Sequence, residues 1–100
     1  MNIAIDYDDT YTAHPEMFNN IIGTLKNFGC NIYIVTYRHS TQFTDMNMDI
    51  EYINDYIFTS GIAKQKYCED NGLMIDIWVD DSPDAICFDF SNLPMRYNYE

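Results

Sequence analysis

The sequence predicts an α/β fold, a three-layer sandwich with a central and mainly parallel sheet. Short apolar runs typical of buried strands alternate with segments of helical periodicity, and the connections between them are short. Right-handed crossovers between parallel strands place helices on both faces of such a sheet. The chain has 100 residues, of which 47% are hydrophobic, and this suits a single domain spanning residues 1–100.

The first half of the chain predicts two strands with a helix between them. Residues 2–6 (NIAID) are a short apolar run that ends in polar sequence, as expected of a strand buried on both faces. Pro15 suits the first turn of a helix, apolar residues recur at helical spacing as far as Phe28, and Gly29 ends the pattern. Residues 31–36 (NIYIVT) are rich in β-branched side chains and predict the second strand.

The second half of the chain continues the alternation. Residues 40–54 carry Phe, Met and Ile at spacings that indicate a helix of modest strength. Residues 55–61 predict a short strand, residues 63–72 a helix, and residues 74–79 a strand followed by two aspartates. Residues 89–100 carry no pattern that assigns them to a helix or a strand.

The charge of the chain limits its partners. Sixteen acidic and five basic residues give a formal net charge of −11. Because this charge repels phosphate backbones and anionic lipid, binding of duplex nucleic acid is disfavoured. A small phosphorylated substrate remains compatible with the sequence, since a divalent ion and one lysine can reverse the local potential.

The cysteines and the apolar runs indicate where the protein works. Cys30, Cys68 and Cys87 are odd in number and lack the spacing of a metal site, so we expect three reduced thiols in the core. The sequence has neither a basic and apolar leader nor a run approaching the roughly 18 apolar residues of a membrane span. We therefore expect a soluble, cytoplasmic protein, for which an oligomer is compatible with the sequence.

Carboxylates follow the first and the last predicted strands. Asp6 and Asp8 end the first, and Asp80 and Asp81 end the last. Ligands bind beyond the carboxyl ends of parallel strands, and in doubly wound, Rossmann-like sheets the first strand is central. With these two strands side by side, the four carboxylates converge and raise one another's pKa unless a cation lies among them. An all-oxygen set of donors favours Mg²⁺.

Further residues at this edge of the sheet suit it to phosphoryl transfer. An aspartate beside such an ion can attack phosphorus, and a second one two residues along the strand shares its face and can handle the proton. Thr36, at the end of the second strand, can donate hydrogen bonds to a phosphoryl oxygen. Lys64 can supply positive charge, and Lys66 is the alternative, since it lies only two residues further along.

The order of these parts resembles the haloacid dehalogenase superfamily of phosphotransferases. Four motifs carry the resemblance and frame about residues 1–86: AID6-Y-D8-D-T10, YIVT36, GIAK64QK and IWVDD81SP. The VDDSP stretch looks most like the nucleotidase-like and polynucleotide-phosphatase-like members. The resemblance implies a Rossmann-like catalytic domain, and so short a chain has no room for a cap domain.

The resemblance also implies roles for single residues. Asp6 would be the nucleophile that forms an aspartyl-phosphate, and Asp8 the general acid and base. Mg²⁺ would be held by the carboxylate of Asp6, the backbone carbonyl of Asp8 and the carboxylate of Asp81, with Asp80 in support.

Thr36 and Lys64 would bind the transferring phosphoryl group, and Thr10 belongs to the first motif in a supporting place. Arg38 lies in the loop after Thr36, where a group could contact substrate, although a surface ion pair is the commoner role of such an arginine. Asp9 departs from the pattern, because the family usually has glycine there. Without a cap the site should be open.

The expected function is that of a Mg²⁺-dependent phosphomonoester hydrolase, with nucleotides or nucleic-acid ends among the candidate substrates. A receiver-type phospho-accepting domain also uses Asp, Thr, Lys and Mg²⁺, but its Lys follows the last strand, whereas Lys64 precedes the final aspartate pair. A metal-binding regulatory protein with little turnover would also keep the fold and the ion, and the missing cap and Asp9 fit this alternative.

Overall fold

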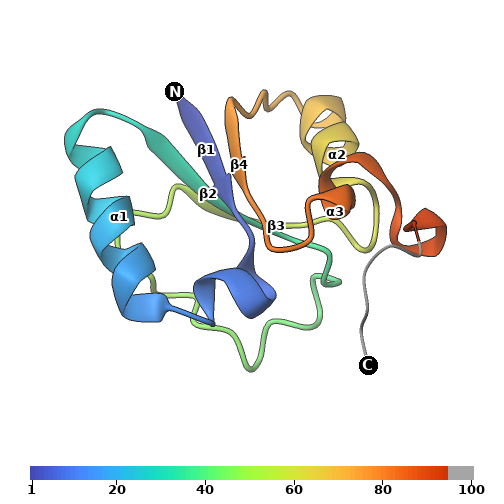
Figure 1. Cartoon of the computed structure of the whole chain (residues 1–100), viewed down its shortest axis with the longest axis horizontal. Coiled ribbons are helices and arrows are strands. Elements are labelled where there is room, and N and C mark those ends of the chain that lie inside the picture. Colours follow the sequence, from blue (N-terminus) through green and yellow to red (C-terminus); the bar gives the residue numbers. More distant parts are fainter. Residues whose placement is uncertain (95–100) are drawn as a thin grey trace.

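The computed structural model describes residues 1–94, and Figure 1 shows its central sheet. The strands are β1 (Asn2–Ile5), β2 (Asn31–Thr36), β3 (Asp55–Phe58) and β4 (Ile77–Val79). Their order is β3-β2-β1-β4, and each neighbouring pair is parallel. The predicted α/β class and the internal position of the first strand are therefore confirmed.

Two of the α-helices pack on the sheet through apolar residues. The α-helices of residues 1–94 are α1 (Pro15–Asn27), α2 (Lys64–Asp70) and α3 (Asp84–Cys87). Phe18 and Ile22 of α1 join the cluster that contains Ile3, Ile5, Ile32 and Ile34. The alternate strand positions Ala4 and Val35 belong to a second cluster with Cys68 of α2. Because neighbouring strand residues point to opposite faces, α1 and α2 cover different faces of the sheet.

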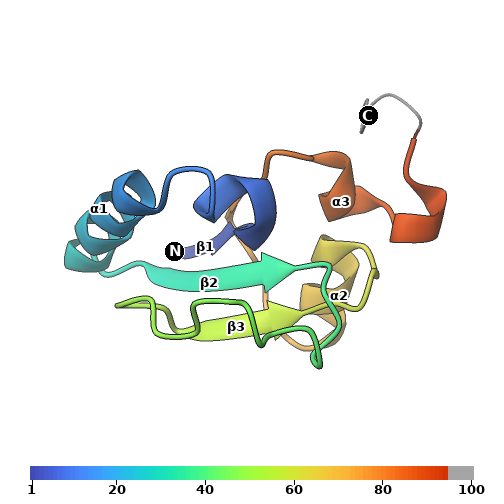
Figure 2. The ribbon, with the colours of Figure 1, turned by 90° about the horizontal axis from the view of Figure 1, so that it is seen from below.

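The strands all end on the same side of the molecule. In Figure 2 the arrowheads of β2 and β3 point toward the end where α2 and α3 lie. The backbone N–H of Asp6, directly after β1, donates to Val79 O at the end of β4 at 2.9 Å. The chain segments that follow β1 and β4 therefore leave the sheet side by side.

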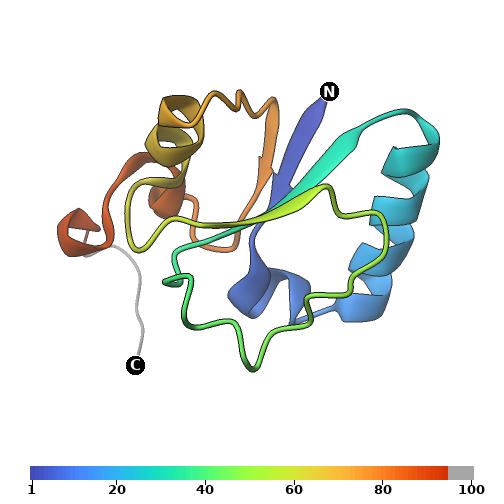
Figure 3. The ribbon, with the colours of Figure 1, turned by 180° about the vertical axis from the view of Figure 1, so that it is seen from behind.

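The helix predicted over residues 40–54 is wrong. This stretch is a loop with isolated turns, and Figure 3 shows it passing beside the turn after β1 and the start of α1. Two tyrosine hydroxyls accept its backbone N–H groups, from Asn47 to Tyr7 at 2.8 Å and from Ile50 to Tyr56 at 3.0 Å. Distant side chains therefore satisfy backbone donors that a helix would have bonded internally.

Other predicted elements are shorter than the sequence indicated. The strand expected over 55–61 stops at Phe58, because Ser60 takes a left-handed backbone with φ of 55° that no strand can continue. The strand expected over 74–79 is reduced to its last three residues. Of the unassigned C-terminal stretch, Phe90–Asn92 forms a single 3₁₀ turn, and residues 95–100 lie outside the described residues.

The expected burial of the cysteines is confirmed only in part. All three are free thiols; Cys68 is buried and Cys30 half-buried, but Cys87 is exposed. Cys87 is the last residue of the short helix α3. Among residues 1–94, no helix has both the length and the apolar character that crossing a bilayer requires.

The packing predicts unequal effects for two isoleucines of the sheet. Ile34 is fully buried, whereas Ile77 is 44% exposed. We expect Ile34→Ala to lower the free energy of unfolding by about 2–4 kcal/mol, because it leaves a cavity between α1 and the sheet. The matched substitution Ile77→Ala should cost about 1 kcal/mol or less. Urea unfolding followed by circular dichroism measures both, and equal losses would contradict this account of the core.

Candidate active site

The ends of β1, β2 and β4 border a cavity of about 920 Å³. It lies beyond the carboxyl ends of the strands, where α/β proteins bind ligands. Asp6, Asp8, Thr36, Lys64 and Asp81 all line it. The structure therefore brings residues of all four motifs to one place.

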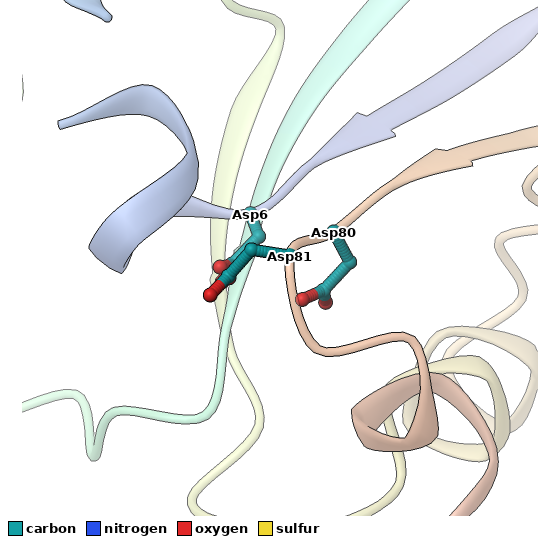
Figure 4. A group of neighbouring side chains, drawn as sticks. All are labelled: Asp6, Asp80 and Asp81. Carbon is teal, nitrogen blue, oxygen red and sulfur yellow. The ribbon is translucent and has the colours of Figure 1, made fainter. Parts of the chain in front are cut away.

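Three carboxylates form the centre of the site. Asp6 follows β1, and Asp80 and Asp81 follow β4; Figure 4 shows the three side chains directed into the same space. One oxygen from each lies within 4.8 Å of the others. The adjacent position of β1 and β4 produces this approach, as the predicted strand order required.

Thr10 connects two of these carboxylates. Its Oγ1 lies 3.1 Å from Asp6 Oδ2 and 3.0 Å from Asp81 Oδ1, and it accepts a hydrogen bond from the Asp81 N–H at 3.0 Å. A hydroxyl has one proton to donate, so it can satisfy only one of the two carboxylates at a time. The other contact needs a further proton or a cation.

Lys64 provides the positive charge within hydrogen-bonding distance of this cluster. It is the first residue of α2 and only 2% exposed, and its Nζ lies 2.8 Å from Asp6 Oδ1 and 2.6 Å from Asp80 Oδ2. Lys66, the alternative in the sequence, points outward and pairs with Asp70 at 2.5 Å. The structure thus places Lys64 in the site and Lys66 outside it.

The pKa of Asp6 is raised from 3.8 to about 7, and burial of the carboxyl group is the main cause. The positive charge of Lys64 lowers this pKa, while the negative charge of Asp80 raises it. Three carboxylates share one lysine, and all the offered donors are oxygens. The three carboxylates of Asp6, Asp80 and Asp81 could hold a hard divalent cation such as Mg²⁺.

The carboxylate of Asp8 was predicted to converge with those of Asp6, Asp80 and Asp81 in one pocket, and it lines the same cavity, but it is not among the three carboxylates that lie within 4.8 Å of one another. It is held instead by Arg38, whose Nε and Nη2 donate to its two oxygens at 2.8 and 2.7 Å. Arg38 also pairs with Asp45 at 2.5 Å and lies over the ring of Tyr7, 5.6 Å from its centroid. The side chain of Asp8 is nevertheless 46% exposed and lines the cavity. Arg38 therefore belongs to the site through an ion pair with Asp8.

The backbone of the turn after β1 accounts for an aspartate at position 9, where the family pattern usually has glycine. Residues 7–11 form a wide turn, in which the N–H of Thr12 donates to Tyr7 O, and Asp9 has φ of 61° and ψ of 0°. This left-handed conformation is the one that favours glycine, and among other residues aspartate and asparagine tolerate it best. The Asp9 N–H donates to Thr12 Oγ1 at 2.9 Å. Aspartate thus occupies a glycine-type backbone position.

Thr36 and two aromatic residues complete the cavity. Thr36 is 1% exposed, and its Oγ1 accepts the Arg38 N–H at 3.2 Å. Tyr37 and Phe90 also line the cavity, and neither was predicted to do so. The position of Tyr37 directly after Thr36 was an available signal. Phe90 lies in the unassigned C-terminal stretch and had none.

Comparison with family models, curated proteins and solved structures bears on the resemblance to the haloacid dehalogenase superfamily. No family model, curated protein or solved structure matches the chain. The resemblance therefore stays a prediction. The distances and burial given above do not depend on it.

The raised pKa of Asp6 predicts a pH dependence of stability. Without divalent ions, the unfolded chain loses the Asp6 proton near pH 3.8, whereas the folded chain keeps it up to about pH 7. The stability from this group is complete below the lower value and is lost as the pH rises through the higher one. Relative to Asp6→Asn, the parent should lose up to about 4 kcal/mol across this range. Urea unfolding in a chelator measures this, and parallel profiles would contradict it.

Proposed function

We propose that the protein is a Mg²⁺-dependent phosphomonoester hydrolase that works through an aspartyl-phosphate on Asp6. The observation that carries the proposal is the surrounding of Asp6. Its carboxylate ends the internal strand β1, is hydrogen-bonded to the buried Lys64, and lies beside Asp80 and Asp81. The order of the four motifs supports the same function.

In this proposal the reaction proceeds in two steps. An Asp6 oxygen attacks the phosphorus of the monoester, the bond from phosphorus to the ester oxygen breaks, and the leaving alcohol takes up a proton. Water then attacks the aspartyl-phosphate, which releases inorganic phosphate and restores the Asp6 carboxylate. Lys64 holds Asp6 in place and stabilises the negative charge on the transferring group. Thr36 supplies hydrogen bonds to the phosphoryl oxygens.

Asp6, Asp81 and the backbone carbonyl of Asp8 would hold Mg²⁺, with Asp80 in support. When bound, the ion neutralises the carboxylates and polarises the phosphoryl group. Asp80 also accepts the N–H of Ser82 at 2.9 Å and the Nζ of Lys64, so its carboxylate is fixed on both sides. Asp80 thus holds Lys64 and the chain after β4 in place beside Asp6.

Asp8 would give the proton to the leaving oxygen and later take one from water. In the structure both of its oxygens accept a hydrogen bond from Arg38, so this ion pair competes with its use as a proton carrier. This pairing favours a second candidate function, a metal-binding regulatory protein with little turnover. Turnover distinguishes the two.

The proposal predicts phosphate release from an aryl phosphate that depends on Mg²⁺. Asp6→Asn should lower kcat by about a thousandfold or more, because it removes the nucleophile. Asp70→Asn makes the same chemical change on an exposed carboxylate of α2 and should leave kcat unchanged. A parent without activity, or an active Asp6→Asn variant, would refute the hydrolase.

The two lysines give a second matched pair for the same assay. Lys64→Met should abolish turnover, whereas Lys66→Met should leave it intact, because only Lys64 contacts Asp6.

Metal binding predicts a change in thermal stability that is independent of turnover. Millimolar Mg²⁺ should raise the unfolding midpoint by about 5 °C or more at neutral pH, because the ion binds the folded cluster. Asp81→Asn should reduce the rise, while Asp70→Asn should keep it. Differential scanning fluorimetry at constant ionic strength measures the midpoint. An unchanged midpoint in the parent would count against a metal site in either candidate function.

A further inference from the structure

A segment after α3 forms one wall of the cavity. Phe90 and Leu93 line it, and the backbone around them is attached to the loops that follow β2 and β3. The attachments are hydrogen bonds from the Tyr37 hydroxyl to Phe88 O, from the Phe90 N–H to Gly61 O at 2.7 Å, and from the Ala63 N–H to Asp89 Oδ1 at 2.8 Å. Residues 88–93, the cavity wall, are therefore held in place by bonds to two separate loops.

Gly61 lets the cavity wall approach closely. It has φ of +79°, and a Cβ at this position would lie 3.4 Å from Phe90 Cβ. A larger residue would be strained in this left-handed conformation, although its Cβ would make only an ordinary van der Waals contact with Phe90. The backbone thus fits Phe90 against this loop.

Two aromatic rings lead from the phosphate-binding lysine along this wall. Lys64 Nζ lies 5.5 Å from the centroid of the Tyr37 ring, and the Tyr37 and Phe90 rings meet edge to face at 6.0 Å and 82°. The side chain of Phe90 remains 67% exposed although its backbone is fixed. An exposed aromatic ring on the wall of a cavity offers a surface that another ring can cover.

The charged residues that line the cavity limit how many phosphate groups the ligand can carry. Lys64 and Arg38 are the cationic residues that line it, and each is already paired with aspartates. With a net charge of −11 on the chain, these cations suit one phosphate group and not the series of phosphates in a nucleic-acid end. A volume of about 920 Å³ is in the range that holds a ligand of several ring units.

We infer that Tyr37 and Phe90 bind the base of a nucleoside monophosphate whose phosphate lies at Lys64. This inference depends on the proposed function for the chemistry at Asp6. Tyr37 lies beside Lys64, and Phe90 in turn contacts Tyr37. A sugar between the phosphate and the base would let the base extend from Lys64 past Tyr37 to Phe90. Stacking on aromatic side chains tolerates different bases, because every base has a π-face.

The test compares adenosine 5′-monophosphate with ribose 5-phosphate, which lacks the base. In the parent with Mg²⁺, kcat/KM should favour the nucleotide by about tenfold or more. Phe90→Ala should reduce this preference by about tenfold, mainly through KM, and Phe90→Tyr should restore it. Phe28→Ala removes another exposed phenylalanine, at the end of α1 and outside the residues that line the cavity, and should keep the preference. No preference in the parent, or an unchanged one in Phe90→Ala, would overturn the inference.

Calorimetric titration of the Asp6→Asn protein separates this inference from the proposed function. We expect the nucleotide to bind more tightly than ribose 5-phosphate, and we expect this difference to disappear when Phe90→Ala is added. These two results would support the base site even if the parent shows no turnover. Equal binding of the two ligands overturns it even if the parent is an active phosphatase. Phenyl phosphate is the third ligand. If Phe90→Ala weakened the binding of phenyl phosphate as much as that of the nucleotide, the Phe90 ring would lie next to the phosphate. This result would contradict a site for the base of a nucleoside.

Discussion

The buried ion pairs of Lys64 are the interaction on which the site depends. An ammonium group that is withdrawn from water needs partners, and Asp6 and Asp80 provide them from the ends of two adjacent strands. The same bonds fix the start of α2 against the sheet. One side chain thus ties the start of the helix to the ends of two strands and fixes the direction of the Asp6 carboxylate. The remaining negative charge among the carboxylates is what makes the site suited to a cation.

The parts of the fold that could be predicted from the sequence are those whose burial follows a local pattern. The strand at residues 31–36 and the helix from Pro15 have apolar residues at regular spacing, and both formed where the pattern placed them. The loop over 40–54 has similar apolar residues, but Tyr7 and Tyr56 accept its backbone N–H groups. Both tyrosines lie outside the stretch, so the spacing of apolar residues within 40–54 does not reveal these hydrogen bonds.

The candidate site also has residues whose positions could be predicted from the sequence and residues whose positions could not. Parallel strands and their order predicted that Asp6, Asp80 and Asp81 would approach one another, because each follows directly from a strand end. Asp8 lies only two residues beyond Asp6, yet its carboxylate turns to Arg38, since the wide turn after β1 rotates it away from the cluster. Phe90 reaches the cavity through backbone bonds, and no residue type or spacing in the sequence signals them.

The sheet order has an entropic consequence. β1 pairs with β4, so that Ile3 lies opposite Ile77, and the chain must close a loop of more than seventy residues before these strands meet. Pairing of β1 with β2 closes a much shorter loop, from Ile3 to Ile32. The entropic cost of closing a loop grows with its length, so the pairing of β1 with β4 carries a larger closure cost than the pairing of β1 with β2. Asp6 and Asp81 meet only when the longer loop has closed, so assembly of the cluster carries the larger of the two closure costs.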